Sequence, residues 1–135
     1  MIKIVLDTNV LISALIKIGK PRKLFYEIVK GKAQLILSME ILDEFARTLG
    51  DPEIRKYVEE EDAVKFLRVV GSVAKIVKMK SRFKVVEDPN DDVILRTAYD
   101  GKAGYIVSGD EHLLSLKEFR EIKIVTVAEM LELLS

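Results

Sequence analysis

The sequence predicts an α/β protein, a three-layer α/β/α sandwich around a mainly parallel central sheet of four to five strands. Short apolar runs rich in β-branched residues alternate along the chain with stretches whose apolar residues recur at helical spacing. The short runs are apolar on both faces, which is typical of parallel strands that helices cover on both sides. Because the 135 residues include no repeat or linker and 49% of them are hydrophobic, we expect a single domain spanning 1–135.

The first half of the chain supplies two of the expected strands and several helices. Pro21 stands where a missing N–H costs a helix nothing, and Ser38 can cap a helix through its hydroxyl. The patterns place these elements, in chain order, as strand 2–6, helix 10–16, a helix from Pro21 to near Gly31, strand 34–37, a helix from Ser38 to Leu49, a helical region from Asp51 and helix 59–70.

The second half opens with a basic segment whose periodicity is that of a strand. In residues 75–85, cations alternate with less polar residues, which predicts a strand with one basic face: Lys78, Lys80, Arg82 and Lys84. The elements expected after it are a helix from the turn at 88–92 to about Gly101, strand 105–108, a short helix near 112–116, strand 122–126 and a closing helix over 127–134.

Composition excludes several classes of site. Lys plus Arg equals Asp plus Glu at 22 each, so net charge indicates no particular partner. The absence of cysteine excludes disulfides and thiolate metal sites, and the single histidine, His112, excludes a multi-histidine zinc site. No apolar run reaches the ~18 residues of a membrane span, and no signal-like start is present, so we expect a cytoplasmic protein without membrane contact. The charge-rich, cysteine-free composition is typical of a thermophile.

Acidic residues follow the expected strands or open the helices beside them. Because parallel strands end on the same edge of a sheet, where open α/β sheets bind ligands, their carboxylates are expected to meet. Each acid alone is explained as well by an N-cap, a helix-dipole contact or a solvated helix face, so the prediction rests on their convergence. The candidates are Asp7, Glu40, Glu44, Asp91, Asp92 and Asp110.

Several carboxylates on one edge of a sheet need a compensating partner. Two such charges about 4 Å apart repel by roughly 4 kcal/mol at an effective dielectric constant of about 20, so either some are protonated or a cation lies among them. Oxygen ligands without His or Cys favour Mg²⁺ or Mn²⁺ over zinc. The expected chemistry is metal-assisted hydrolysis of a phosphodiester or a phosphate.

Four segments in order and at suitable spacing are IVLDTNVLISAL, SMEILDEFARTL, DPNDDVILRTAYDGKAGYIVSGDEHLL and IVTVAEMLELL. Together they resemble the PIN-domain ribonucleases over nearly the whole chain, and most of all VapC-type toxins. The resemblance implies that Asp7, Glu44 and Asp110 are catalytic, metal-binding acids. The family's remaining acid corresponds to Asp92 or Asp91, and spacing to the later Ser-Gly-Asp turn favours Asp92.

The resemblance also assigns supporting roles around these acids. Ser108 stands where the family has a hydroxyl that is hydrogen-bonded to the first acid. Asn9 stands where a small polar residue orients ligands or a water. Glu40 lies one helical turn before Glu44 on the same face and is the alternative to it.

The implied activity is Mg²⁺- or Mn²⁺-dependent cleavage of single-stranded RNA that leaves a 5′-phosphate and a 3′-hydroxyl. The resemblance further implies the toxin of a toxin–antitoxin pair, a homodimer with an antitoxin protein as partner. Because an acidic edge repels RNA, cations must offset it, and two groups could contact the RNA phosphates. They are Lys20, Arg22 and Lys23, and Lys78, Lys80, Arg82 and Lys84. A role as edge-strand cations that discourage pairing with another sheet explains the second group at least as well as RNA binding does.

Two other functions are compatible with the sequence. One is a Mg²⁺-dependent phosphatase, although a haloacid-dehalogenase-like enzyme requires Asp-x-Asp after the first strand and Asn9 stands at the second position. The other is a non-catalytic module that binds a metal or a partner, which the presence of all four acids disfavours.

Overall fold

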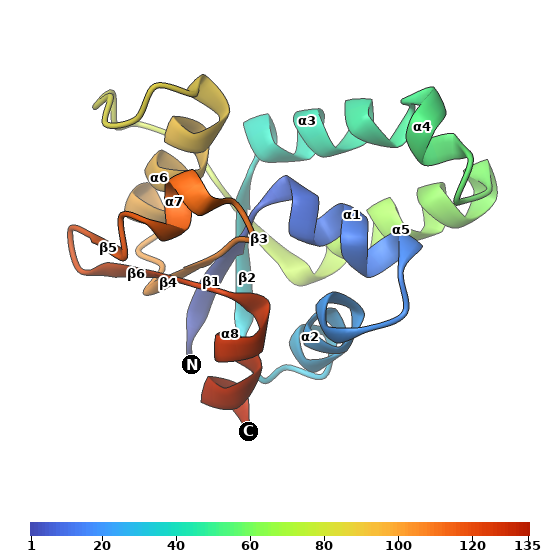
Figure 1. The fold of residues 1–135 in the computed structure, drawn as a ribbon, viewed down its shortest axis with the longest axis horizontal. Coiled ribbons are helices and arrows are strands. Elements are labelled where there is room, and N and C mark those ends of the chain that lie inside the picture. Colours follow the sequence, from blue (N-terminus) through green and yellow to red (C-terminus); the bar gives the residue numbers. More distant parts are fainter.

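The computed structural model describes residues 1–135 and contains six strands and eight helices (Figure 1). In chain order they are β1 (Lys3–Leu6), α1 (Thr8–Ile16), α2 (Lys20–Val29), β2 (Gln34–Ser38), α3 (Met39–Leu49), α4 (Pro52–Arg55), α5 (Glu60–Val73), β3 (Ala74–Val77), α6 (Pro89–Asp100), β4 (Tyr105–Val107), α7 (Glu111–Leu114), β5 (Glu118–Phe119), β6 (Ile122–Val125) and α8 (Val127–Leu134). The α/β class predicted from the sequence is confirmed.

The sheet has the strand order β3-β2-β1-β4-β6-β5. Its first five strands are parallel, and the two-residue strand β5 runs antiparallel to β6. Leu6 of β1 pairs with Val107 of β4, and Ser38 of β2 pairs with Val77 of β3. The residues that follow these strands therefore emerge side by side on one edge of the sheet, hereafter the carboxyl edge.

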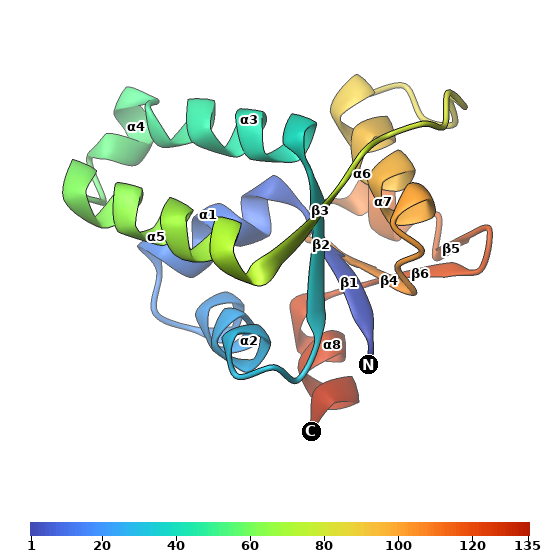
Figure 2. The same cartoon turned by 180° about the vertical axis from the view of Figure 1, so that it is seen from behind.

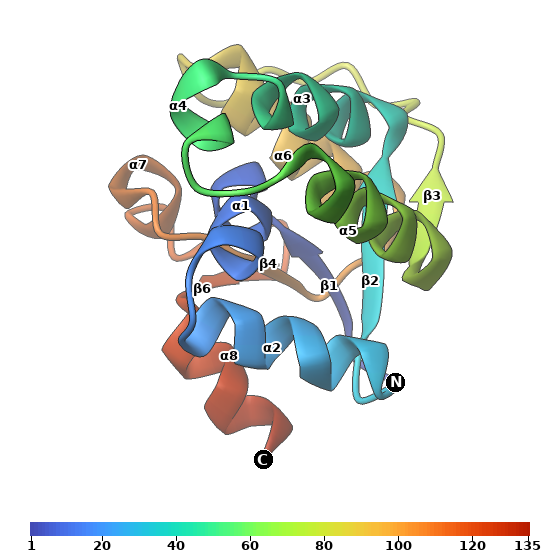
Figure 3. The ribbon, with the colours of Figure 1, turned by 90° about the vertical axis from the view of Figure 1, so that its right-hand side faces the viewer.

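Helices cover both faces of the sheet. α6 packs against β1, β2 and β4 on one face. In Figure 3, α1, α2 and α5 lie in front of the sheet and α6 lies behind it. α3, α4 and α5 extend away from the sheet as a helical arm (Figure 2). No helix is both long and apolar enough to cross a membrane.

Burial explains why the strand runs are apolar on both faces. Ile4, Val5 and Leu6 of β1 are at most 1% exposed, because the helices exclude water from both sides of the sheet. They belong to a core of 30 buried hydrophobic residues.

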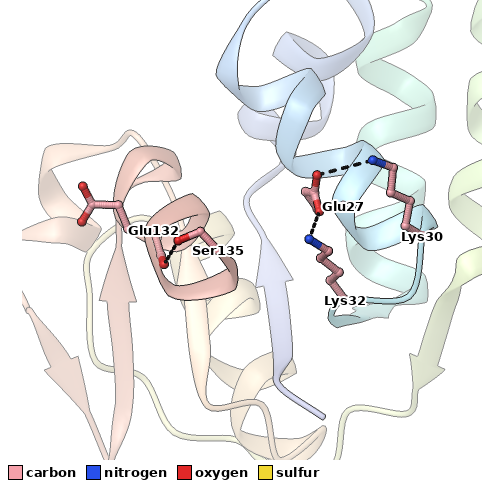
Figure 4. Close-up of polar contacts among 5 residues, drawn as sticks. All are labelled: Glu27, Lys30, Lys32, Glu132 and Ser135. Carbon is pink, nitrogen blue, oxygen red and sulfur yellow. Dashed lines mark hydrogen bonds and ion pairs between the residues drawn. The ribbon is translucent and has the colours of Figure 1, made fainter.

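Local side chains place the helix ends near the predicted positions. The hydroxyl of Ser38 accepts a hydrogen bond from the backbone N–H of Ile41 (3.3 Å) and caps α3. Near the end of α2, Glu27 forms ion pairs with Lys30 (3.7 Å) and Lys32 (3.1 Å) at the turn into β2 (Figure 4). This turn precedes β2 and so lies at the edge of the sheet opposite the carboxyl edge.

Two predictions about strands are wrong. The strand predicted over 75–85 ends at Val77, because its neighbour β2 ends at Ser38 and no strand remains to pair with the chain. Residues 78–88 belong to no strand. The sheet has six strands rather than four to five, since β5 has no apolar run to indicate it and depends on the turn at Arg120 and Glu121, both at positive φ.

The end of α6 lies so close to the sheet that only a glycine fits after it. Gly101 is buried, and a Cβ there would overlap the Ile36 side chain and lie 3.0 Å from the Thr97 carbonyl oxygen. We expect Gly101→Ala to lower the free energy of unfolding by about 1–3 kcal/mol, because overpacking displaces α6. Urea unfolding measures this change.

Gly104→Ala is the matched control, because a Cβ at that position meets no atom within 4 Å. It should change the stability by less than about 0.5 kcal/mol. Equal stability of the two variants would contradict the close seating of α6.

Candidate functional site

Asp7 follows β1 and is buried, with 8% of its surface exposed. It occupies the N-cap position of α1 but its side chain makes no capping hydrogen bond, so capping does not explain it. Its Oδ2 instead accepts a hydrogen bond from the hydroxyl of Ser108 (2.8 Å). Burial raises the pKa of Asp7, and the hydrogen bond from Ser108 opposes this effect without cancelling it.

Ser108 connects Asp7 to a second acid. Its Oγ accepts a hydrogen bond from the backbone N–H of Asp110 (3.0 Å) while its hydroxyl donates to Asp7. Asp110 caps α7, because its Oδ1 accepts a hydrogen bond from the backbone N–H of His112 (2.9 Å). The negative charge of Asp110 also contributes to the raised pKa of Asp7, so the two carboxylates interact. The structure thus brings Asp7, Ser108 and Asp110 together, as the sequence predicts.

Asp91 is the third acid of this group. It lies in the first turn of α6, is only 6% exposed, and is not the cap of the helix, since that role belongs to Asp88. Burial is the largest cause that raises the pKa of Asp91 to about 6. The negative charges of Asp110, Asp88 and Asp7 add to this shift, and so does a hydrogen bond with the carboxyl of Asp110.

The side chain of Asp92 forms hydrogen bonds with the backbone and not with the other acids. It is 1% exposed, and its Oδ1 accepts hydrogen bonds from the backbone N–H groups of Val85 (2.9 Å) and Val86 (3.2 Å). Its Oδ2 is buried and has no hydrogen-bond partner. The carboxylate of Asp92 therefore holds the chain before α6, whereas that of Asp91 interacts with Asp7 and Asp110.

The acids of α3 differ from each other. Glu44 is partly buried, and its Oε2 accepts a hydrogen bond from the hydroxyl of Thr8 (3.4 Å), the residue next to Asp7. Glu40 is exposed and makes no side-chain hydrogen bond or ion pair. Asn9 is also exposed. Sequence reasoning missed Thr8, although its place directly after the strand-end acid could have indicated it.

The first predicted basic group lies away from the acids. The Nε and Nη2 of Arg22 donate to the carbonyl oxygens of Ala14 (2.9 Å) and Leu15 (2.6 Å), in the last turn of α1. Ile16, the last residue of α1, lies about 12 Å from Thr8, since eight helical rises of 1.5 Å separate the two residues. Lys20 and Lys23 are exposed beside Arg22 in α2. Arg22 therefore caps the carbonyl groups at the C-terminal end of α1.

The acids could supply some of the ligands of a metal ion, but not a complete coordination shell. No three side chains of His, Cys, Asp or Glu are close enough to hold a metal ion by themselves. Mg²⁺ commonly retains several waters and is held by one or two carboxylates plus substrate phosphates, so it needs no such cage. The raised pKa values of Asp7 and Asp91 show carboxylates that no positive group compensates. This all-oxygen, uncompensated site fits a hydrated hard divalent cation.

Comparison with known proteins identifies the family. The family model described as PIN domain matches residues 3–112, which include Asp7, Glu44, Asp91 and Asp110. The chain belongs to the PIN-domain family. PIN domains are typically nucleases and generally bind divalent metal ions.

Two other comparisons give one protein similar in sequence and one similar in fold. The chain is 38% identical over 119 residues to an uncharacterized protein of Methanocaldococcus jannaschii, and the match covers 87% of this chain and 76% of that protein. The fold is similar to a chain in the crystal structure of VapBC2 from Rickettsia felis bound to a DNA fragment from their promoter. That similarity has a TM-score of 0.65 at 15% identity and covers 93% of this chain and 98% of the other.

The pKa of Asp91 predicts how the metal-free PIN domain responds to pH. Folding raises this pKa from 3.8 to about 6, so between these values the native state holds a proton that the unfolded chain has released. The free energy of unfolding should therefore fall as the pH rises from about 4 to about 6, and then level off. We expect Asp91→Asn to flatten this slope and to raise stability at pH 7 by about 1 kcal/mol, less than the whole shift implies because solvent screens part of it.

Thermal unfolding in EDTA at a series of pH values measures both effects. Asp43→Asn is the control, since it removes an exposed acid of α3. A pH profile of Asp91→Asn that matches both the control and the unmodified protein would contradict the raised pKa.

Proposed function

We propose that this protein is an endoribonuclease that hydrolyses phosphodiester bonds of single-stranded RNA with Mg²⁺ or Mn²⁺. The observation that carries the proposal is the convergence of three acids on the carboxyl edge, where Ser108 forms hydrogen bonds with both Asp7 and Asp110, and the charges of these two act on Asp91. Buried acids that repel one another are unfavourable for folding, so their convergence indicates a functional role. Membership of the PIN-domain family supports nuclease chemistry at this edge.

We assign the metal-binding role to Asp7, Asp91 and Asp110, with Glu44 beside them. Asp91 replaces Asp92, which the sequence had favoured, because the charges of Asp7 and Asp110 act on Asp91, whereas Oδ1 of Asp92 accepts hydrogen bonds from two backbone N–H groups. Glu44 is preferred to Glu40 because it reaches Thr8, next to Asp7.

The protein's contribution is to fix these oxygens before substrate arrives. The hydrogen bond from Ser108 fixes the orientation of the Asp7 carboxylate, and the N-cap contact fixes Oδ1 of Asp110 and leaves its Oδ2 available. A bound divalent cation supplies Lewis acidity for the phosphate and lowers the pKa of a coordinated water. Because the side chains are already ordered, little reorganisation is needed when charge develops on the phosphate.

We also propose that the protein is the toxin of a toxin–antitoxin pair. The sequence resemblance to VapC-type toxins and the structural similarity to a VapBC2 chain support an antitoxin protein as partner. An apolar groove of about 790 Å³ between α1–α2 and α4–α5 is a suitable surface for it, since exposed side chains such as Ile18, Tyr26 and Tyr57 line it. The homodimer implied by the resemblance stays a prediction.

Single substitutions test the assignment of the acids. With unstructured RNA and Mn²⁺, we expect Asp7→Asn and Asp91→Asn to reduce the cleavage rate by about a hundredfold or more, because each removes an oxygen ligand. Glu40→Gln should cleave at the unmodified rate. Asp92→Asn should retain cleavage within about tenfold and lose thermal stability, because it disturbs a hydrogen-bonded anchor.

The same assay includes an aryl phosphate and calorimetry with Mn²⁺. Hydrolysis of the aryl phosphate without RNA cleavage would replace the proposal with a phosphatase. Metal binding without cleavage of any RNA pool would replace it with a non-catalytic module. Wild-type cleavage by Asp7→Asn would remove the proposed site.

Growth of a bacterial host tests the toxin proposal. Induced expression of the unmodified protein should arrest growth, because unrestrained cleavage removes RNA that the host needs to grow. Asp7→Asn, expressed to the same level on an immunoblot, should allow normal growth. Equal arrest by both proteins would show that the toxicity does not come from the acidic site.

A further inference from the structure

The segment 78–86 connects β3 to α6 outside the sheet (Figures 1 and 2). We name it the basic strap. Its cations are exposed and form no salt bridge, and they alternate with partly buried residues. The strap contains four cations and no acid, whereas the whole chain has no net charge, so the strap is a local excess of positive charge. The cations are Lys78, Lys80, Arg82 and Lys84, and the partly buried residues between them are Met79, Ser81 and Phe83.

Three side chains of α6 hold the backbone of the basic strap. They stand four residues apart, so they form one stripe along the helix. Their hydrogen bonds replace those that a neighbouring strand would make. Asp100 Oδ2 accepts from the N–H groups of Lys80 (2.8 Å) and Ser81 (3.0 Å), Arg96 Nε donates to the carbonyl oxygen of Phe83 (2.7 Å), and Asp92 Oδ1 accepts from Val85 (2.9 Å) and Val86 (3.2 Å).

Phe83 anchors the middle of the basic strap by aromatic contacts. Its ring packs edge-on against Tyr99, with the centroids 5.6 Å apart, and at 5.1 Å from the ring of Phe119. The guanidinium carbon of Arg120 lies 4.6 Å from the centroid of the Phe83 ring. The strap is therefore fixed at its middle and along its length, and its cations project from an ordered backbone.

The structure weakens the main alternative explanation of these cations. Lysines protect an exposed edge strand from pairing with another sheet, but the edge strand β3 ends at Val77 and the four cations follow it. A purely solubilising charge would not need backbone anchors from Asp92, Arg96 and Asp100.

We propose that the basic strap binds the phosphate backbone of single-stranded RNA and leads the strand to the acids, an inference that rests on the proposed ribonuclease function. Alternate residues of an extended segment stand about 6–7 Å apart, a spacing suited to successive phosphates of an extended single strand. Only Glu87 and Asp88 separate the strap from α6, whose first turn carries Asp91. Because the backbone is already ordered, binding costs little further conformational entropy.

Salt-dependent binding tests the proposal. The probe is fluorescent oligouridine RNA, measured by anisotropy in EDTA so that no cleavage occurs. We expect the variant in which Lys78, Lys80, Arg82 and Lys84 are all changed to Gln to bind at least tenfold more weakly at low salt. The slope of log K against log salt should become shallower by about 2–3, because each lost phosphate contact contributes about 0.7.

A second four-cation variant is the matched control. It changes Lys17, Lys102, Lys117 and Lys123 to Gln, all of which are exposed and unpaired elsewhere on the surface. This control should bind within about twofold of the unmodified protein. Equal losses in both variants, or no RNA binding by the unmodified protein, would overturn the proposal. Equal loss of duplex DNA and RNA binding would also overturn it, by showing a general polyanion surface.

Asp100→Ala separates the anchored strap from simple net charge. It removes a negative charge and also the hydrogen bonds to Lys80 and Ser81, so net charge alone favours tighter RNA binding whereas loss of the anchor favours weaker binding. We expect binding about threefold weaker. Glu118→Ala makes the same charge change at an exposed β5 side chain that forms no hydrogen bond or ion pair, and this variant should bind as tightly as the unmodified protein or slightly more tightly. Tighter binding by Asp100→Ala would contradict a preordered strap.

These experiments can contradict the strap proposal and the ribonuclease proposal independently of each other. If the strap binds RNA as expected but no RNA is cleaved with Mn²⁺, the surface stands and the ribonuclease proposal fails. If RNA is cleaved and the four-cation strap variant binds and cleaves like its control, the ribonuclease stands and the strap proposal fails.

Discussion

The hydrogen bond from Ser108 to Asp7 joins two residues that are 101 positions apart, and the acidic site depends on it. It can form only because β1 and β4 are parallel neighbours that end together on the carboxyl edge. Without it, Asp7 would be a buried carboxylate that no other side chain holds. The same hydroxyl oxygen accepts the N–H of Asp110, so one serine positions two acids. The geometry of the site is thus a consequence of strand order.

α6 contributes to both the acidic site and the basic strap because neighbouring residues on a helix point in different directions. One residue corresponds to about 100° of rotation, so Asp91 and Asp92 cannot face the same partner. Asp91 interacts with the acids of the carboxyl edge, and Asp92 begins the stripe that holds the basic strap. Any displacement of α6, such as overpacking at Gly101, would move Asp91 and the basic strap together.

The sequence was sufficient to predict the buried strands and the acids that lie at their carboxyl ends. The apolar runs identified the buried strands, and parallel packing then implied that Asp7 and Asp110 lie on one edge. The choice between Asp91 and Asp92 could not be predicted, because it depends on the rotation of α6 against the sheet. The prediction of a strand over 75–85 was wrong because it too depended on tertiary structure. The alternating pattern is present, but a strand also needs a neighbouring strand to pair with, and β2 ends at Ser38.

The acids also explain why metal binding and folding should be coupled in this protein. Repulsion and burial raise the pKa values of Asp7 and Asp91, so the metal-free native state is stabilised by protons near pH 4 and loses that stabilisation as the pH rises. A cation that binds only the native state reverses this loss, because it replaces the protons at the same oxygens. At the proposed site protons and metal therefore compete, and we expect the affinity for the cation to decline as the pH falls below about 6, where Asp91 becomes protonated.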